Sequence, residues 1–502
     1  MSWQPSKLCV SILPDSLDHV WELLENCASA DIIELRLDHL GMIPFKEVLK
    51  RSNKPLIITL RLPQEEGFWK GTEAERAQIF QQAVNEGIDY VDIEWKSAPS
   101  LLAQLTLSAK TATIISHHVR QNKPDQLKKT FKAMQELQAD VYKLVYWADH
   151  LNDNHITLDL LEEARKEGIS FVIHAMGEMG QISRLLGAIR GNSWSYVSLP
   201  ETGPTAKGQI SLDIAQEIYG LPEKSQYTRI IGLLGYPLVQ SRGWQFHNRL
   251  IQYVKKNPEI YGENVQDYLY VNFPEKDLSG FWSRWQGTVD ALSVTIPHKE
   301  RVVDKLDFVS STVDKSGVCN TIIKRHKQWW GFNTDMLAIY DLLNESEFKL
   351  FKGELVYGTG ATARSAMTAL KELNVQNIML SGRNRSDGLQ LAKTFGIDFV
   401  DERDLMEIHP EVIIQTTPVG MFPKTENAPP LTHLLSKAKL VLDVIHNPPL
   451  TQFLKEAQAA NCIIISGEKM YLRQAAYQFK LFSGIDIPFS DIENVWNRQI
   501  KK

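Results

Sequence analysis

The chain has 502 residues, which is long enough for two to four domains. Hydrophobic residues make up 43% and charged residues 23%, which are ordinary values for globular proteins and exclude disordered and fibrous classes. With 55 Lys and Arg against 60 Asp and Glu, the net charge is −5, so no basic excess favours nucleic acid or an anionic membrane as a partner. No apolar run has the length of a membrane helix, and the first residues lack the layout of a secretory signal.

The four cysteines, at positions 9, 27, 319 and 462, lie far apart and form no CxxC pair. This spacing is typical of reduced thiols and differs from that of a disulfide framework or a zinc site. We therefore expect a cytoplasmic enzyme that binds no metal ion, with small molecules as its partners. The sequence leaves the oligomeric state open.

Short β-rich apolar segments recur through the first 200 residues, with helical segments such as 125–139 and 159–168 between them. Eight βα units in roughly 220 residues predict a (β/α)₈ barrel, that is, a TIM barrel. An open doubly wound sheet is the alternative, but it usually holds fewer strands. The expected strands are 7–13, 31–38, 55–61, 90–95, 113–118, 141–148, 171–176 and 194–199.

A polar stretch at 220–229 ends this pattern, and a new strand at 229–235 opens the second half. There, a mixed α/β segment precedes a strand–turn–helix–strand unit over 354–382 that is typical of a Rossmann nucleotide-binding lobe. The fold class is therefore α/β throughout. The expected domains are a barrel at 1–222, a substrate-binding lobe at 227–340, and a Rossmann lobe at 341–502 whose C-terminal helices return to the substrate-binding lobe.

Lys143 lies among large apolar neighbours in the sixth expected strand, VYKLVYW. A lysine on a strand often extends its ammonium group to solvent. In a closed barrel, however, each strand residue points either into the barrel or at the helix layer, so Lys143 would be desolvated. Desolvation disfavours the charged form and leaves an amine that can attack a carbonyl to form an imine.

Other chemically competent side chains lie at the ends of neighbouring strands. His117 and His118 end the fifth strand, and histidine is the usual general acid or base near neutral pH, although such a pair is often structural. Charged residues at the other strand ends would suit a substrate rich in carboxylate and hydroxyl groups, which points to a class I aldolase or a Schiff-base dehydratase. These charged residues are Glu34, Arg36, Arg61 and Arg184.

Five ordered segments resemble type I 3-dehydroquinate dehydratase over about residues 5–220. The resemblance implies that Lys143 forms the imine with the substrate ketone, and that His118, rather than His117, moves the α-proton. No metal takes part. The segments are ELRLDHL (34–40), SHHVRQNKP (116–124), DVYKL (140–144), AMGEMGQISR (175–184) and TAKGQIS (205–211).

The same resemblance implies substrate-binding roles for further residues. Glu65 matches a loop glutamate of the family, but the Gly-Gly that usually follows is Glu66-Gly67 here, so Glu65 and Glu66 are alternatives for this role. The residues matched to the binding of ring hydroxyls and of the substrate carboxylate are Glu34, Arg36, Arg61, Arg184, Thr205 and Gln209.

A GxGxxA turn joins an expected strand to a helix in the second half. Glycines at such a turn let the backbone approach a pyrophosphate at the N-terminus of the helix. After the next strand, arginines stand where an NAD enzyme places an acidic residue, which favours the 2′-phosphate of NADP. The turn residues are Gly358, Gly360, Ala361, Thr362 and Ala363, and the residues after the next strand are Arg383, Asn384 and Arg385.

Six segments over about residues 229–490 resemble shikimate dehydrogenase. They are SVTIPHK (293–299), GVCNT (317–321), GFNTD (331–335), TTPVGM (416–421), DVIHNPPLT (443–451) and GEKMYLRQAAYQF (467–479). The resemblance implies that Lys299 and Asp335 are the catalytic pair. It also implies that Ser241, Thr295, Asn320 and Gln474 bind substrate, and that Thr416, Met421 and Gly467 bind the cofactor.

The chain departs from the shikimate dehydrogenase pattern at three places. The family's Ser-x-Ser-Pro is Ser241-Arg242-Gly243-Trp244 here, so one hydroxyl donor to the substrate carboxylate is missing. The tyrosine of Tyr-Asn-Pro is His446, and the Asn-Arg-Thr that clamps NADP is Gly382-Arg383-Asn384.

The two resemblances concern consecutive reactions, since the product of the first is the substrate of the second. We therefore expect a bifunctional enzyme that dehydrates 3-dehydroquinate to 3-dehydroshikimate and reduces the product to shikimate with NADPH. Two alternatives are that the dehydrogenase half acts on quinate or a related polyol acid with NAD, and that one half is a scaffold without activity. The presence of Lys143, His118, Lys299 and Asp335 argues against the scaffold.

Overall fold

The computed structural model describes residues 6–120, 123–263, 265–346 and 353–499. The chain divides into two compact units, residues 1–229 with 267–271 and residues 230–266 with 272–502. Residues 121–122 of the predicted segment 116–124 lie outside the described ranges. No helix in the described part of the chain is both long and apolar enough to cross a membrane.

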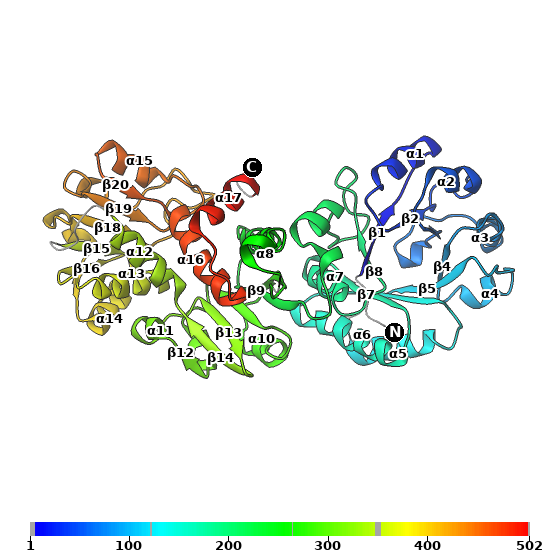
Figure 1. Cartoon of the computed structure of the whole chain (residues 1–502), viewed down its shortest axis with the longest axis horizontal. Helices are drawn as coiled ribbons and strands as arrows, with labels where there is room; N and C mark the ends of the chain where they lie inside the picture. Colours follow the sequence, from blue (N-terminus) through cyan, green and yellow to red (C-terminus); the bar gives the residue numbers. More distant parts are fainter. Residues whose placement is uncertain (1–5, 121–122, 264, 347–352, 500–502) are drawn as a thin grey trace. The chain divides into compact units, whose positions relative to one another are not determined.

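The first unit contains eight parallel strands that curl into a nearly closed barrel, in the order β7-β6-β5-β4-β3-β2-β1-β8 (Figure 1). All eight strands coincide with the predicted segments, so the predicted barrel is confirmed. The strands are β1 (Lys7–Ile12), β2 (Ile32–Arg36), β3 (Leu56–Thr59), β4 (Tyr90–Glu94), β5 (Ala112–His118), β6 (Val141–Trp147), β7 (Phe171–Met176) and β8 (Trp194–Val197).

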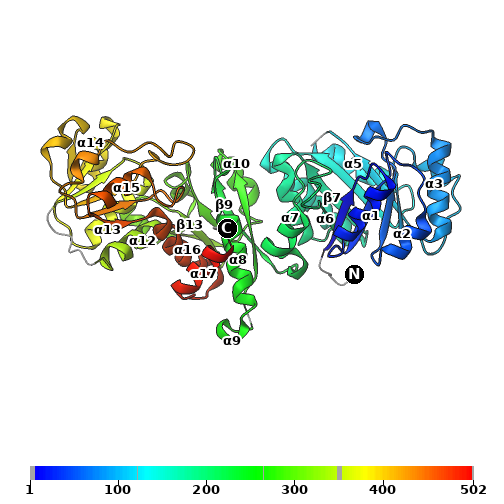
Figure 2. The same cartoon turned by 90° about the horizontal axis from the view of Figure 1, so that it is seen from above.

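Seven helices alternate with these strands and lie on the outside of the sheet (Figure 2). Local sequence explains their ends: Thr72 and Glu75 form a capping box at the start of α3, and Gly168 ends α6 in the left-handed conformation with φ +72°. The helices are α1 (Leu17–Asn26), α2 (Phe45–Arg51), α3 (Glu73–Glu86), α4 (Ala98–Leu102), α5 (Pro124–Met134), α6 (His155–Glu167) and α7 (Gln181–Ala188).

The barrel interior is built in layers because side chains alternate along each strand. An apolar cluster fills one layer and includes Cys9, Ile32, Ile57, Ile114, Val141, Val172 and Trp194. In each of these strands, the residue two positions after the apolar one, toward the C-terminal end of the strand, is polar. Strand β4 contributes a polar residue at the same level. This polar layer consists of Ser11, Glu34, Thr59, Asp92, Ser116, Lys143, His174 and Tyr196.

A six-stranded mixed sheet follows, in the order β10-β9-β11-β13-β14-β12, and all of it except residues 229 and 268–271 belongs to the second unit. Strands β9 and β11 are parallel, whereas β13 and β14 form an antiparallel hairpin. The elements are β9 (Arg229–Gly235), α8 (Gly243–Lys255), α9 (Pro258–Tyr261), β10 (Tyr268–Pro274), α10 (Leu278–Trp285), β11 (Ala291–Val294), β12 (Phe308–Val309), α11 (Ser311–Ser316), β13 (Thr321–Arg325) and β14 (Gln328–Phe332).

A second six-stranded sheet follows, parallel throughout, in the order β17-β16-β15-β18-β19-β20. This is the 3-2-1-4-5-6 order of a Rossmann fold, and the order reverses at β15. The elements are α12 (Thr334–Asn344), β15 (Glu354–Tyr357), α13 (Ala361–Glu372), β16 (Ile378–Ser381), α14 (Arg385–Phe395), β17 (Asp398–Val400), β18 (Val412–Gln415), β19 (Leu440–Asp443), α15 (Gln452–Ala459), β20 (Ile463–Ile465), α16 (Gly467–Ser483) and α17 (Phe489–Gln499).

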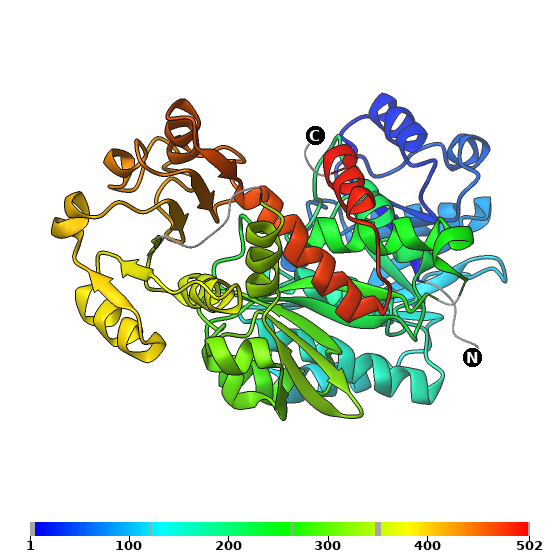
Figure 3. The same cartoon turned by 60° about the vertical axis from the view of Figure 1, so that its left-hand side comes forward.

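Helix α16 connects the two lobes of the second unit. It follows β20 of the Rossmann sheet and packs against α12, α8 and β13, so it carries the chain back to the first lobe (Figure 3). The two lobes of this unit therefore meet along α16, and a Rossmann enzyme binds its ligands at such a junction.

Candidate active sites

Lys143 lies inside the barrel, and its ammonium group is surrounded by acceptors from three other strands. Nζ lies 3.0 Å from Glu34 Oε1, 3.0 Å from Asp92 Oδ2 and 3.0 Å from the Tyr196 hydroxyl. The residue is only 4% exposed. Burial of an ammonium group is costly unless it is paired, and here two carboxylates offset that cost. The lysine is therefore a buried, fixed group and not a solvent-extended one.

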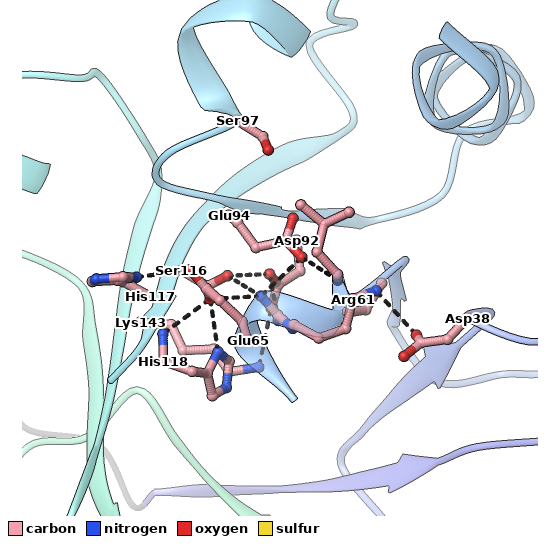
Figure 4. Close-up of polar contacts among 12 residues, drawn as sticks. Asp38, Arg61, Glu65, Asp92, Glu94, Ser97, Ser116, His117, His118 and Lys143 are labelled. Atoms are coloured by element: carbon pink, nitrogen blue, oxygen red, sulfur yellow. Dashed lines mark hydrogen bonds and ion pairs between the residues drawn. The ribbon is translucent and has the colours of Figure 1, made fainter. Parts of the chain in front are cut away.

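Asp92 joins Lys143 to a second cation, Arg61, at the end of β3 (Figure 4). The guanidinium donates from Nη2 to Asp92 Oδ1 at 2.8 Å and from Nη1 to Ser116 Oγ at 2.7 Å. Burial raises the pKa of Asp92, but the charges of Arg61 and Lys143 outweigh it and hold that pKa well below its usual range. Asp92 is therefore a permanent anion that fixes both cations.

His118 lies on β5, next to the strand of Lys143, and is held by Glu65. Glu65 Oε2 accepts from the His118 backbone N–H at 3.0 Å and lies 3.2 Å from Nδ1 of the same ring. Burial and the nearby Arg61 cation lower the pKa of His118 to about 4. The ring is thus neutral at pH 7, with its proton on Nδ1 toward the carboxylate and Nε2 available as a base.

The structure distinguishes the two alternatives for the loop glutamate. Glu65 is 7% exposed and contacts both histidines. Burial alone would raise the pKa of Glu65, but the hydrogen bonds from His117 and His118 hold that pKa well below its usual range. Glu66 adopts φ +65° and points outward to Arg120, 2.6 Å away. Glu65 is therefore the one that the chain brings into the barrel site.

Arg184 is a buried cation whose guanidinium has no hydrogen-bond partner among the described residues. It lies in α7, just after β7, and is 2% exposed. Burial lowers the pKa of Arg184 to about 9, so the group still carries its charge at pH 7. A desolvated, unpaired guanidinium is costly by itself and is well suited to a carboxylate ligand.

The remaining predicted barrel residues lie at the same C-terminal end of the strands. Arg36 shares a face of β2 with Glu34 and donates from Nε to Asp38 at 3.0 Å. Thr205 donates to Gln209 Oε1 at 3.1 Å, within a segment that follows β8. This segment lies against the turn after β7, since the Gly177 backbone N–H donates to the Lys207 carbonyl at 3.3 Å.

Three residues of the barrel site were missed in the sequence. Asp92, His174 and Tyr196 belong to the polar interior layer together with Lys143. His174 is 5% exposed, and burial together with the Arg184 and Lys143 charges holds its pKa well below the usual range. A signal for all three was present in the sequence. Each residue stands two positions after a residue of the inner layer in its own strand, so its side chain also points into the barrel.

In the second unit, Lys299 and Asp335 form an ion pair at the junction of the lobes. Nζ of Lys299 donates to Asp335 Oδ2 at 2.7 Å, and both side chains are largely buried. Lys299 is held by its carbonyl, which accepts from the Cys319 backbone N–H at 2.8 Å. Asp335 lies in the first turn of α12, where the helix dipole stabilises a negative charge.

A buried polar network lies beside this pair. Asn320 Nδ2 donates to Thr334 Oγ1 at 2.9 Å, and Thr334 Oγ1 donates to Gln474 Oε1 at 3.3 Å. Thr295 follows β11 and is fixed by its backbone N–H, which donates to the Leu234 carbonyl at 2.9 Å. Ser241 Oγ accepts from the Gly243 backbone N–H at 3.3 Å at the start of α8.

The GxGxxA turn lies where the Rossmann sheet reverses its strand order. Gly358 adopts φ +125°, and a Cβ there would lie 2.3 Å from Thr416 Oγ1. Helix α13 begins at Ala361 without a hydrogen bond from a capping side chain, so its first N–H groups can bind an anion. These features fit the pyrophosphate of a dinucleotide. The other turn residues, Gly360, Thr362 and Ala363, lie in this same segment.

The residues after β16 have different partners. Arg383 is exposed, and no hydrogen bond or ion pair to it is found within the described ranges. Asn384 caps α14 by accepting from the Asp387 backbone N–H at 3.3 Å, whereas Arg385 donates to Asp401 at 3.1 Å. Arg383 is therefore the arginine best placed to meet a 2′-phosphate.

Two further predicted cofactor residues lie across the Rossmann lobe. Met421 is 40% exposed in the loop after β18, and Gly467 starts α16. A Cβ on Gly467 would lie 2.3 Å from the Ile445 carbonyl, so this glycine lets the helix start close to that backbone. Within the described ranges, no group of His, Cys, Asp and Glu side chains is arranged to hold a metal ion.

Comparison with known proteins agrees with the division into two halves. Residues 8–226 match the type I 3-dehydroquinase family, and residues 233–322 match the shikimate dehydrogenase substrate binding domain. The bifunctional 3-dehydroquinate dehydratase/shikimate dehydrogenase of Arabidopsis thaliana is 28% identical, over 96% of this chain and 83% of the relative.

Two shikimate dehydrogenases (NADP(+)) match the second half. That of Caldanaerobacter subterraneus subsp. tengcongensis is 30% identical, over 51% of this chain and 92% of the relative. That of Clostridium perfringens is 29% identical, over 53% of this chain and 97% of the relative. The second half of the chain thus belongs to the shikimate dehydrogenase family, and the first half contains a type I 3-dehydroquinase domain.

Proposed function

We propose that the chain is a bifunctional enzyme of the shikimate pathway. Its barrel dehydrates 3-dehydroquinate to 3-dehydroshikimate, and its second unit reduces 3-dehydroshikimate to shikimate with NADPH. The observation that carries the proposal is the barrel interior, where a buried lysine lies in one layer with two carboxylates while a buried arginine is left without a partner. A substrate that has both a ketone and a carboxylate would supply a reaction partner for Lys143 and an ion-pair partner for Arg184.

Lys143 is the nucleophile of the first reaction. Its ammonium must first lose a proton, and the Glu34 carboxylate, 3.0 Å away, is an acceptor within reach. The amine then attacks the ketone carbon, and the ketone oxygen leaves as water to give the imine. The protonated imine withdraws electrons from the adjacent carbon and makes its C–H bond more acidic.

His118 moves the proton in the next step. Its neutral ring takes the α-proton of the imine and returns it to the departing hydroxyl, which leaves as water. A second water molecule then hydrolyses the product imine, which restores the ketone and frees the Lys143 amine. Glu65 holds the ring by Nδ1 and stabilises the imidazolium that forms in between. Arg184 binds the carboxylate, while Glu34, Arg36 and the segment with Thr205 and Gln209 surround the ring hydroxyls.

The rate of dehydration is expected to fall on the acid side as His118 becomes protonated. The base form is required, and burial and nearby cations place the pKa of His118 at about 4. Activity should therefore persist well below the ordinary range of histidine, near 6.5, and decline only as the pH approaches 4. The pH profile of kcat/KM for 3-dehydroquinate measures this; an acid limb centred near 6.5 would contradict it. Intrinsic fluorescence at each pH separates a catalytic limb from unfolding.

Lys299 and Asp335 carry the proton chemistry of the second reaction. NADPH supplies the hydride to the carbonyl carbon of the substrate. The reacting oxygen gains negative charge as the hydride arrives, and the Lys299 ammonium, held by Asp335 at 2.7 Å, donates a proton to it. Asn320, Thr295 and Gln474 are placed to bind substrate hydroxyls beside that pair.

NADPH binding is assigned to the strand-order reversal of the Rossmann sheet. The GxGxxA turn and the N-terminus of α13 would hold the pyrophosphate, and Arg383 would bind the 2′-phosphate. Thr416, Met421 and Gly467 complete the proposed site from the neighbouring loops.

Gly358→Ala is expected to abolish NADPH binding and leave dehydration intact. The added Cβ meets Thr416 Oγ1 at 2.3 Å, and the φ of +125° costs a residue other than glycine about 1–3 kcal/mol. Fluorescence titration with NADPH measures binding. Gly287→Ala is the control, since a Cβ there meets nothing within 4 Å. Tight NADPH binding by Gly358→Ala would contradict this site.

The proposed function is tested by a coupled assay on the purified protein. Supplied with 3-dehydroquinate and NADPH, the enzyme should consume NADPH and accumulate shikimate. Supplied with 3-dehydroshikimate, it should do so without the first reaction. Formation of 3-dehydroshikimate without NADPH oxidation would overturn the second activity, and oxidation only with 3-dehydroshikimate would overturn the first.

A second candidate function rests on the segment after β9. Gly243 stands where the family has a second carboxylate-binding serine, which leaves Ser241 as the single hydroxyl of that motif. Oxidation of quinate with NAD, compared with oxidation of shikimate with NADP, distinguishes the two: a higher kcat/KM for quinate and NAD would favour this alternative.

We place the protein in the cytoplasm, with its small-molecule substrates as partners. The four cysteines are buried free thiols, as expected for a reducing compartment. The net charge of −5 gives no support for binding nucleic acid or an anionic membrane.

A further inference from the structure

His117 has an unusual position for a histidine on a barrel strand. Side chains alternate along β5, so Ser116 and His118 face the interior and His117 faces the other side. A histidine there would ordinarily pack in the helix layer. Instead, Nδ1 of His117 lies 2.7 Å from Glu65 Oε1, and the residue is only 7% exposed (Figure 4).

Glu65 is thereby held at both oxygens. His117 donates to Oε1, while Oε2 accepts from the backbone N–H of His118 at 3.0 Å and lies 3.2 Å from the His118 ring. The bond to His117 is the shortest of the three. Trp95, at the end of β4, packs edge-on against the His117 ring with centroids 5.4 Å apart and so fixes its orientation.

A competing partner for the carboxylate lies close by. Nη1 of Arg61 is 3.6 Å from Glu65 Oε2. If Oε1 loses the His117 bond, rotation of the carboxylate toward Arg61 gains a charge-assisted hydrogen bond. That rotation takes Oε2 away from His118 Nδ1, and the ring is then free to carry its proton on Nε2, where the α-proton must be received.

We propose that His117 is a positioning residue for the dehydration: it anchors Glu65 Oε1 so that Oε2 keeps His118 in the tautomer with Nε2 unprotonated. This rests on the proposed function of the barrel. The pair of adjacent histidines therefore has two roles, with His118 on the substrate side and His117 behind the carboxylate. His117 touches neither the substrate nor the reacting atoms.

The test compares His117→Leu, which removes the donor, with His117→Asn, whose amide can donate from nearly the same place. For His117→Leu, kcat for dehydration should fall about 10- to 100-fold with KM for 3-dehydroquinate unchanged, and His117→Asn should recover most of the loss. His155→Leu, a change at a similarly buried (8% exposed) histidine in α6, is the matched control and should keep kcat.

Trapping of the imine with borohydride separates this inference from the proposed function. His117→Leu should form the Lys143 adduct with 3-dehydroshikimate as fully as the wild type, because imine formation does not require the His118 tautomer. If the wild type forms no adduct, the proposed function fails. If the adduct forms but His117→Leu has the kcat of the wild type, or His117→Asn is as slow as His117→Leu, the role of His117 is overturned.

The protonation state of the His118 ring can be measured in the wild type, so this test does not depend on how the variants fold. In the protein with ¹⁵N-labelled histidine, the His118 ring, assigned through His118→Gln, should carry its proton on Nδ1 at pH 7. In His117→Asn it should stay there. A wild-type ring protonated on Nε2 would overturn the proposal.

Discussion

Lys143→Ala should abolish dehydration of 3-dehydroquinate while the second unit keeps reducing 3-dehydroshikimate. The loss should be about 10⁴- to 10⁶-fold, as for removal of a covalent nucleophile. Borohydride should trap no adduct, because no other buried amine lies in the polar layer of the barrel as described. The assay is NADPH consumption with each of the two substrates.

The same change should also lower the stability of the barrel. Removal of the ammonium leaves Glu34 and Asp92 buried without the cation that both contact at 3.0 Å. Breaking a buried ion pair from one side costs about 3–5 kcal/mol. Urea unfolding measures this cost, and Lys143→Met, which keeps most of the side-chain volume, shows how much of it arises from lost charge.

Lys166→Ala is the control for Lys143. That lysine is exposed on α6 and pairs with Glu162 at 2.7 Å, and such a surface pair contributes about 0–1 kcal/mol. It should leave the dehydration rate and the unfolding midpoint as they are. Retention of dehydration, or of the adduct, by Lys143→Ala would contradict the assignment of the nucleophile.

Lys299→Met and Asp335→Asn should each remove shikimate dehydrogenase activity and leave dehydration at the wild-type rate. Loss of a general acid typically lowers the rate about 10²- to 10⁴-fold. Because the two side chains form one ion pair at 2.7 Å, the double variant should be little slower than the slower single variant. The measurement is kcat for 3-dehydroshikimate reduction at saturating NADPH.

Lys315→Met provides the matched control in the same lobe. Lys315 lies in α11 and pairs with Glu372 at 2.8 Å on the surface. The Lys315→Met variant should keep the wild-type rate of 3-dehydroshikimate reduction. Additive losses in the Lys299 and Asp335 double variant would mean that the two residues act independently, which would contradict the role of the pair.

Much of the fold followed from local patterns. The eight barrel strands were recognised because each is a short apolar run bounded by turns, and each expected position agrees with the structure. Element ends were less regular: the helix expected over 125–139 ends at Met134, because Gln135 and the residues after it form turns in place of further helical bonds. The local sequence predicts the start of a helix better than its end, because packing against the rest of the protein decides how far the helix continues.

Local sequence patterns identified only some of the residues in the candidate sites. Lys143 stood out because a charged residue is rare among such apolar neighbours, and Lys299, Asp335 and the glycine turn lay in recognisable segments. Asp92 did not stand out, although it contacts both Lys143 and Arg61. A single aspartate in a strand has no local signal that distinguishes a structural partner from a surface charge.

The sequence by itself determined the kinds of elements and their order, and it predicted the families of both halves and the reactive residues in each. Tertiary structure decided which residues surround them. Glu34 reaches Lys143 across 109 positions of the chain, and Glu65 rather than Glu66 turns to the histidines. The physical reason is that these contacts depend on strand register and on the curvature that brings eight strands around one interior. Neither is encoded in the spacing of residues along any single strand.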